Sequence, residues 1–99
     1  MKGPLFAKKR DANEAALKTD MLGLGIVAWP MDQPVDLMCW SIEHDVLFLV
    51  EIKNPDTSDR RKDKRTKGQI EFFIAAEELK VPVFIIETRE DIVKALEKL

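Results

Sequence analysis

Two carboxylates and a lysine stand at the ends of neighbouring apolar runs, where they could bind a divalent metal ion. Glu51 and Lys53 close the apolar run 46–50, which has the pattern of a strand buried on both faces. Residues two apart in a strand point to the same side, so the Glu51 carboxylate and the Lys53 ammonium should project together. Asp36 stands near the start of the preceding apolar run, 35–40.

A hairpin would bring these three side chains to one place. With its turn at Glu43 and His44, residues whose numbers sum to about 87 should face each other across the two strands. That register pairs Asp36 with Glu51. The sequence therefore predicts two carboxylates and one lysine at a single strand end.

Such a group suits phosphodiester hydrolysis. Magnesium is a hard cation that binds a few carboxylates and keeps waters and phosphate oxygens as its other ligands. It polarises the phosphate and lowers the pKa of a bound water, and a nearby lysine adds positive charge or acts as a base. One cysteine and one histidine cannot form a Cys/His zinc site. Nucleophilic catalysis by serine or cysteine would depend on His44, which we place in the hairpin turn.

The elements that must position this group follow from hydrophobic periodicity and capping signals. Asp11 is the predicted N-cap of the first helix, with Glu14 at its third position, and the inward stripe of the second helix is predicted at Ile70, Phe73, Ala76 and Glu77. The predicted order is helix 11–22, strands 26–29, 35–42 and 46–53, helix 66–79, strand 81–86 and helix 89–99. Trp29, Trp40 and Cys39 are expected in the core.

Composition sets the outer bounds. A length of 99 residues suits one domain, which we place at 11–99 after a basic N-terminal arm, 1–10. No apolar run approaches the roughly 20 residues of a membrane span, so no membrane partner is expected. A single cysteine and the absence of a signal-peptide pattern favour a cytoplasmic location.

The basic residues are unevenly distributed, although the net charge is −2. Residues 54–68 carry six bases against three aspartates and directly follow the Glu51–Lys53 strand end. This segment could hold nucleic-acid phosphates beside the metal site, or it could be only a solvated loop. The six bases are Arg60, Arg61, Lys62, Lys64, Arg65 and Lys67.

Four motifs in this order resemble those of the PD-(D/E)XK nuclease superfamily, and most closely its small stand-alone VRR-NUC-type members, often encoded by phages. The matching segments are 11–17, 34–37, 49–53 and 66–72. The resemblance implies an α/β, restriction-endonuclease-like core: a helix, a three-stranded antiparallel meander, a helix, a strand and a final helix. Two segments differ from the pattern: Pro34 stands one place early, and 84–89 lacks the arginine-bearing strand end of the subfamily.

The resemblance also implies a role for each matching residue. Asp36 and Glu51 correspond to the metal-binding acids, the Ile52 carbonyl to a backbone ligand, and Lys53 to the lysine that orients or activates the attacking water. Glu14 corresponds to an acid of the first helix that joins the metal site. Gln69 corresponds to a glutamine near the scissile phosphate.

The resulting expectation is a Mg²⁺-dependent nuclease, with Mn²⁺ as a substitute, acting on DNA that includes branched or flapped forms, in a bacterium or a phage-infected cell. One alternative is a nucleic-acid-binding or assembly module that keeps the fold without turnover. Another is an unrelated α/β domain with coincidental spacing. A homodimer stays open, because so small a domain covers little duplex and no sequence feature identifies an interface.

Overall fold

The computed structural model describes residues 13–54 and 66–99, and its element order is the predicted one. The N-terminal arm and the bases from Arg60 to Arg65 lie outside these ranges. The elements are α2 (Glu14–Gly23), β1 (Ile26–Pro30), β2 (Leu37–Ser41), β3 (Val46–Ile52), α3 (Lys67–Leu79), β4 (Val83–Ile86) and α4 (Arg89–Glu97). Within the described ranges, every helix is too short or too polar to cross a lipid bilayer.

The four strands form one mixed sheet in the order β1-β2-β3-β4. β1, β2 and β3 are antiparallel neighbours, whereas β4 runs parallel to β3 after the chain has passed through α3. In the β2–β3 hairpin, Leu37 pairs with Val50 and Cys39 with Phe48. The predicted register is therefore confirmed, together with the α/β class and the antiparallel arrangement of the first three strands.

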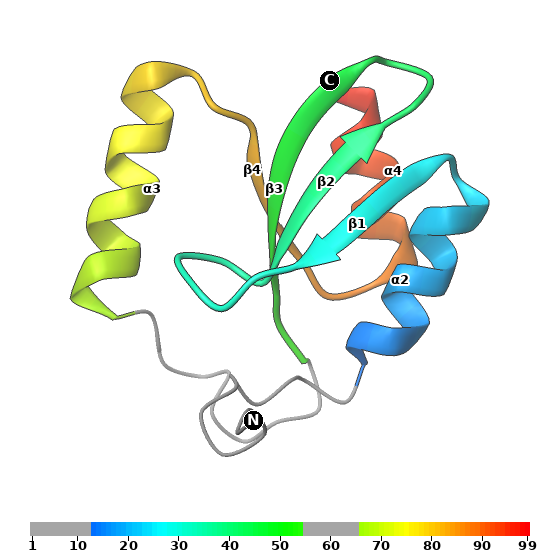
Figure 1. Cartoon of the computed structure of the whole chain (residues 1–99), viewed down its shortest axis with the longest axis horizontal. Helices are drawn as coiled ribbons and strands as arrows, with labels where there is room; N and C mark the ends of the chain where they lie inside the picture. Colours follow the sequence, from blue (N-terminus) through cyan, green and yellow to red (C-terminus); the bar gives the residue numbers. More distant parts are fainter. Residues whose placement is uncertain (1–12, 55–65) are drawn as a thin grey trace, which may run out of the picture.

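The hydrophobic core lies on the sheet face that α2 and α4 cover (Figure 1). Leu17 and Met21 of α2 meet Ile92 of α4 over this face, and the Phe48 ring packs edge-on against Phe84 at 5.8 Å between centroids. Alternation along the strands sends their other side chains to the opposite face, where α3 lies. The sheet thus separates a sealed core from a second, partly covered face.

The start of α2 differs from the prediction, whereas the start of α3 agrees with it to within one residue. α2 begins at Glu14 with Asn13 as its N-cap, so Glu14 is the first helical residue and not the third. Asp11, the predicted cap, lies outside the described residues. α3 begins one residue after Thr66, whose hydroxyl accepts from the Gln69 amide N–H while the Gln69 side chain accepts from the Thr66 N–H. This is a complete capping box, which satisfies two backbone donors at the start of the helix.

Burial on the α3 side also differs from the prediction. The residues of α3 that are buried are Gln69 and Ala76, whereas Ile70, from the predicted stripe, is largely exposed. Ala76 and the half-buried Phe73 belong to the predicted stripe, so the inward face overlaps the expected one, with Gln69 in place of Ile70 and with Glu77 exposed. Trp29 was expected in the core, but its side chain is 47% exposed on the edge strand β1. Trp40 is half-buried, and Cys39 is fully buried as predicted.

Candidate functional site

Asp36 lies one residue before β2 and extends the β2–β3 hairpin beyond its last backbone pair. Its N–H donates to the Val50 carbonyl at 3.1 Å, and its Oδ2 accepts from the Ile52 N–H at 2.7 Å. These contacts fall on either side of Glu51, so Asp36 sits opposite Glu51 as the register predicts. The side chain is only 4% exposed. A carboxylate that bonds a backbone N–H in a buried position is strongly held there.

Glu51 lies near the end of β3 and Lys53 directly follows this strand, and both side chains are on the sheet face where α3 lies. The Lys53 Nζ lies 3.4 Å from the Glu51 Oε2, which confirms that the two side chains project to the same side. The Glu51 side chain is 7% exposed and that of Lys53 is 33% exposed. The lysine therefore reaches solvent while its charge lies against a buried carboxylate.

Gln69 connects α3 to the segment that leads into Asp36. Its Nε2 donates to the Pro34 carbonyl at 2.9 Å, while its Oε1 accepts from the Thr66 N–H at 3.1 Å. Both ends of the side-chain amide are thus used within the protein, in a position that is 8% exposed. In this conformation Gln69 positions α3 against the site, and its predicted contact with the scissile phosphate stays a prediction.

The start of α2 is held at the same end of β3. The Asn13 Nδ2 donates to the Lys53 carbonyl at 3.1 Å and to the Glu87 carbonyl at 3.3 Å, so one amide joins α2 to the ends of β3 and β4. Glu14 follows directly and is 6% exposed. Sequence reasoning missed Asn13, because its partners lie 40 and 74 positions away in the chain.

Three carboxylates are therefore buried around the ends of β2 and β3: Glu14, Asp36 and Glu51. In Glu14 and Glu51 the Oε1 atom is buried and accepts no hydrogen bond from the residues that the structure describes, although both residues have other interactions. Within the described ranges, Asp, Glu, His and Cys side chains form no group of three that could hold a metal ion in this conformation. The donors present are carboxylate and backbone oxygens, which suit a hard cation such as Mg²⁺.

The Cys39 thiol, the Ser41 hydroxyl and the His44 ring have structural roles. Burial raises the pKa of the Cys39 thiol to about 12, which keeps it protonated and unreactive at neutral pH. The Ser41 hydroxyl lies 3.0 Å from the His44 Nδ1 and accepts from the His44 N–H at 3.1 Å. Ser41 is buried at the hairpin end, so this pair closes the turn and leaves no room for a substrate at the hydroxyl.

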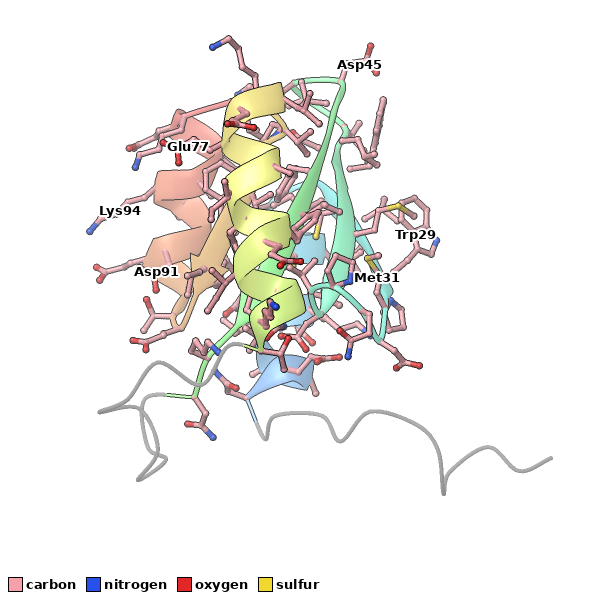
Figure 2. All side chains as sticks on the ribbon, turned by 90° about the vertical axis from the view of Figure 1, so that its left-hand side faces the viewer. Trp29, Met31, Asp45, Glu77, Asp91 and Lys94 are labelled. Atoms are coloured by element: carbon pink, nitrogen blue, oxygen red, sulfur yellow. The ribbon has the colours of Figure 1, made fainter. Side chains whose placement is uncertain are left out.

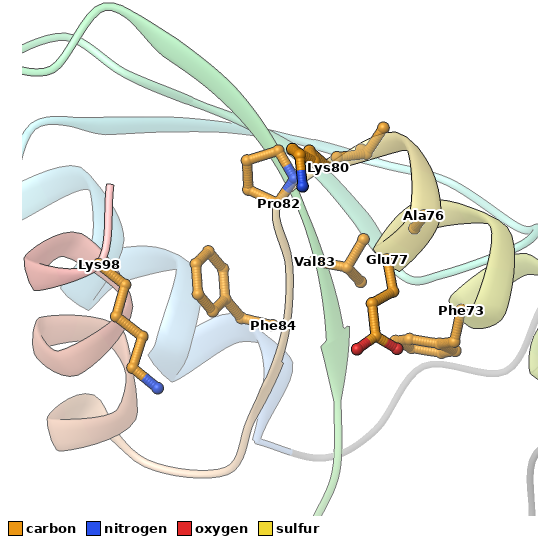
Figure 3. Close-up of a pocket in the computed structure, with 9 residues that line it drawn as sticks. Phe73, Ala76, Glu77, Lys80, Pro82, Val83, Phe84 and Lys98 are labelled. Carbon is orange, nitrogen blue, oxygen red and sulfur yellow. The ribbon is translucent and has the colours of Figure 1, made fainter.

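A pocket of about 570 Å³ opens elsewhere, between α3, β4 and α4 (Figure 3). Phe73 and Glu77 of α3 face Val83 there, and Phe84 points toward Lys98 at the end of α4. None of the predicted metal-binding or catalytic residues lines this pocket. The candidate site is therefore the buried polar cluster, and this pocket is a separate feature.

The structure brings together Asp36, Glu51, Lys53 and Gln69 where β2 begins and β3 ends. It holds Glu14 beside them at the start of α2. Of the six predicted phosphate-binding bases, Lys67 is described, and it is exposed as the first residue of α3. The Thr-x-x-Gln spacing at 66–69 was the signal that could have revealed the capping role of Gln69. Comparisons with protein-family models, with curated proteins and with solved structures found no match.

Proposed function

We propose that this chain is a metal-dependent nuclease with a restriction-endonuclease-like core, hydrolysing phosphodiester bonds in DNA that includes branched or flapped forms. The observation that carries the proposal is the burial of Asp36 and Glu51 on facing strand ends with the Lys53 ammonium 3.4 Å from Glu51. Two buried acids on adjacent strands have a desolvation cost that pairing or coordination must offset, and here the Ile52 N–H and the Lys53 ammonium pair with them.

Each residue has a proposed part in the reaction. Asp36, Glu51 and the Ile52 carbonyl would hold Mg²⁺, or Mn²⁺ in its place, and Glu14 would join them from α2. The bound cation supplies Lewis-acid polarisation of the phosphate and a water of lowered pKa. Lys53 keeps positive charge beside the phosphate and orients the attacking water. Gln69 holds α3 against the Pro34 carbonyl, and this contact fixes the segment that delivers Asp36.

A non-catalytic nucleic-acid-binding or assembly module is the second candidate. It is favoured because two of the same side chains have structural roles. The Asp36 Oδ2 accepts from the Ile52 N–H at 2.7 Å, and both polar atoms of the Gln69 side-chain amide hydrogen-bond within the protein. A residue that only stabilises the hairpin would be buried for that reason alone. Turnover therefore separates the two candidates, and binding does not.

Single-turnover cleavage of linear, flapped and four-way DNA in Mg²⁺ or Mn²⁺ tests the proposal. Glu51→Gln and Lys53→Met, which nearly keep side-chain volume, should each slow cleavage by about 10²-fold or more. Glu51→Gln should also remove the heat of metal binding in a calorimetric titration. Glu43→Gln, at an exposed position in the hairpin turn, is the matched control and should cut normally. Cleavage by Glu51→Gln at the wild-type rate would overturn the assignment, and DNA binding without turnover in either metal would favour the second candidate.

A further inference from the structure

Trp29 is a large aromatic side chain that is about half exposed to solvent. It is 47% exposed, whereas Phe48 is 1% exposed in the core. Trp29 lies on β1, an edge strand, on the sheet face opposite the core, because its neighbour Ala28 packs against the core cluster. Figure 2 shows Trp29 and Met31 to one side of α3, where this helix does not cover them.

The position of Trp29 relative to the candidate site follows from the strand register. Trp29 pairs with Met38, and Met38 pairs with Leu49, so these three side chains form one row across β1, β2 and β3. Glu51 lies two residues beyond Leu49 on the same face. Two strand spacings across and two residues along place the Trp29 and Glu51 backbones roughly 12 Å apart. A short single strand of nucleic acid can span that distance.

The surface along the row from Trp29 to Leu49 is apolar, and beyond this row Asp36 stands opposite Glu51. Met38 and Leu49 are half-buried and lie in the row itself, and Trp40 is half-buried at the diagonal position beside Trp29, on the side away from Glu51. Lys53, beyond Glu51, supplies positive charge and reaches solvent. A flat aromatic ring on the sheet face from which the Lys53 ammonium also projects fits a ligand that carries both a planar group and an anionic group.

We infer that Trp29 is a stacking platform for an unpaired nucleobase of the DNA whose phosphate lies at the Asp36–Glu51 edge. This inference rests on the proposed nuclease function, because that function supplies the nucleic acid. A base inside a duplex has both faces covered by its neighbours, so only a single-stranded, flapped or frayed end can stack on Trp29. The preferred substrate is therefore DNA with unpaired nucleotides near the scissile bond. Base–aromatic stacking tolerates any sequence, since every base has a π-face.

Binding without turnover tests this inference independently of catalysis. Affinities for a short oligothymidylate and for a blunt duplex of equal length are measured in chelator for the wild type, Trp29→Ala, Trp29→Phe and Leu47→Ala. Trp29→Ala should weaken oligothymidylate binding by roughly 5- to 150-fold and leave duplex binding unchanged. Trp29→Phe should restore most of the loss. Leu47, equally exposed on the same face at the far end of the hairpin, is the matched control and should show no loss.

Fluorescence gives a second readout. Trp40→Phe leaves Trp29 as the sole tryptophan of the sequence, so oligothymidylate should quench the emission of this variant. Equal losses on both DNAs, an unchanged affinity, or no oligothymidylate binding at all would overturn the inference. Sedimentation that shows self-association abolished by Trp29→Ala, with DNA binding intact, would assign the surface to a second copy instead. Trp29-dependent binding by a protein that never cleaves would refute the nuclease and leave the stacking platform standing, whereas cleavage with no Trp29 effect would refute the platform alone.

Discussion

Asp36 illustrates how a single side chain can serve the fold and the proposed chemistry together. Its Oδ2 accepts the Ile52 N–H at 2.7 Å, which would otherwise be a buried donor at the end of the ladder. The position is too buried for water to replace that acceptor. Removing the whole carboxylate therefore disturbs both the hairpin end and any bound cation. An alanine variant at this position cannot distinguish loss of catalysis from loss of structure.

We expect Asp36→Ala to lower the free energy of unfolding by about 1–3 kcal/mol, because it leaves the Ile52 N–H unsatisfied. Asp36→Asn keeps an oxygen for that N–H and removes one buried negative charge near Glu51. Its melting temperature in chelator should therefore equal or exceed that of the wild type. Thermal unfolding of the three proteins in chelator measures this order.

The same samples with Mg²⁺ or Mn²⁺ separate charge from structure. The wild type should gain stability with metal occupancy, since a ligand that binds only the folded state raises the melting temperature. Asp36→Asn should lose that gain. An Asp36→Ala protein as stable as the wild type in chelator would refute the structural role, and a full metal response in Asp36→Asn would refute the ligand role.

Cys39 gives a pH-dependent prediction. Burial raises the pKa of its thiol from 9.0 to about 12 in the folded state. Between these values the native protein holds a proton that the unfolded chain has released, so stability falls as pH rises from about 9 toward 12. The contribution of this one group approaches about 1.4 kcal/mol per pH unit in that window. Denaturant unfolding of Cys39→Ala across the same range should show a correspondingly shallower decline, even though its stability is lower at neutral pH. Parallel declines in both proteins would contradict the assignment.

At the scale of elements, the strands were the most predictable part of the molecule. The apolar runs and the turn at Glu43 and His44 predicted the hairpin register, and a one-residue slip from it would send core side chains to the other face. That register in turn placed Asp36 opposite Glu51. The Glu51–Lys53 pair followed from the two-residue period alone.

Features that depend on how elements meet were not predictable. The Asn13 amide finds its partners at Lys53 and Glu87, and local patterns carry no signal for contacts so distant in sequence. The exposure of Trp29 depends on how much of one sheet face α3 covers, which periodicity does not report. Hydrophobic periodicity assigns buried helix positions to apolar residues, so it did not predict the burial of Gln69. This polar side chain is buried with its hydrogen bonds satisfied.

α3 provides the prediction at this scale. Few of its side chains are buried, so the Gln69–Pro34 hydrogen bond is an important attachment near the site, and the capping box holds the first turn of the helix together. Thr66→Ala should cost about 1 kcal/mol and raise amide hydrogen exchange in the first turn of α3. Gln69→Glu keeps the capping acceptor and loses the donor to Pro34. It should therefore leave exchange in that first turn near the wild-type level while slowing DNA cleavage.

Thr88→Ala is the matched control, because Thr88 and Asp91 form the same kind of box at the start of α4. It should increase exchange in α4 and leave cleavage unchanged. If Gln69→Glu cleaves DNA as fast as the wild type, the hydrogen bond to Pro34 does not position the site. If Thr88→Ala slows cleavage as much as Gln69→Glu does, the effect is general destabilisation.

At the scale of the whole molecule, the acids of the candidate site and the clustered bases of 54–68 occupy different parts of the chain. The described acids at the site lie at the ends of β2 and β3, while most of the bases of 54–68 belong to the stretch that joins β3 to α3. Both ends of that stretch are placed by described contacts. Lys53 is anchored through its carbonyl to Asn13, and the start of α3 is anchored through Gln69 to Pro34. The described residues at its two ends, Lys53 and Thr66, therefore lie beside the candidate site.

Because both of its ends lie at the site, the basic stretch should bind DNA phosphates there and leave the chemical step alone. Replacing Arg60, Arg61 and Lys62 by Ala should weaken DNA binding at low salt and flatten the slope of log affinity against log salt by about one to three units, since each phosphate neutralised contributes close to −0.9. Cleavage at saturating DNA should change little, because these side chains position the backbone and do not stabilise the transition state.

Lys53→Met should behave in the opposite way, with a modest loss of affinity and a large loss of single-turnover rate, because the Lys53 ammonium lies against Glu51 at the proposed metal site. Affinity at several salt concentrations and single-turnover rates for both variants measure the contrast. A matched control, Lys8→Ala with Lys9→Ala and Arg10→Ala, removes the same charge from the N-terminal arm. If that control flattens the salt slope and the 60–62 variant keeps it, the DNA path follows the arm and the charges after Lys53 do not contact phosphate.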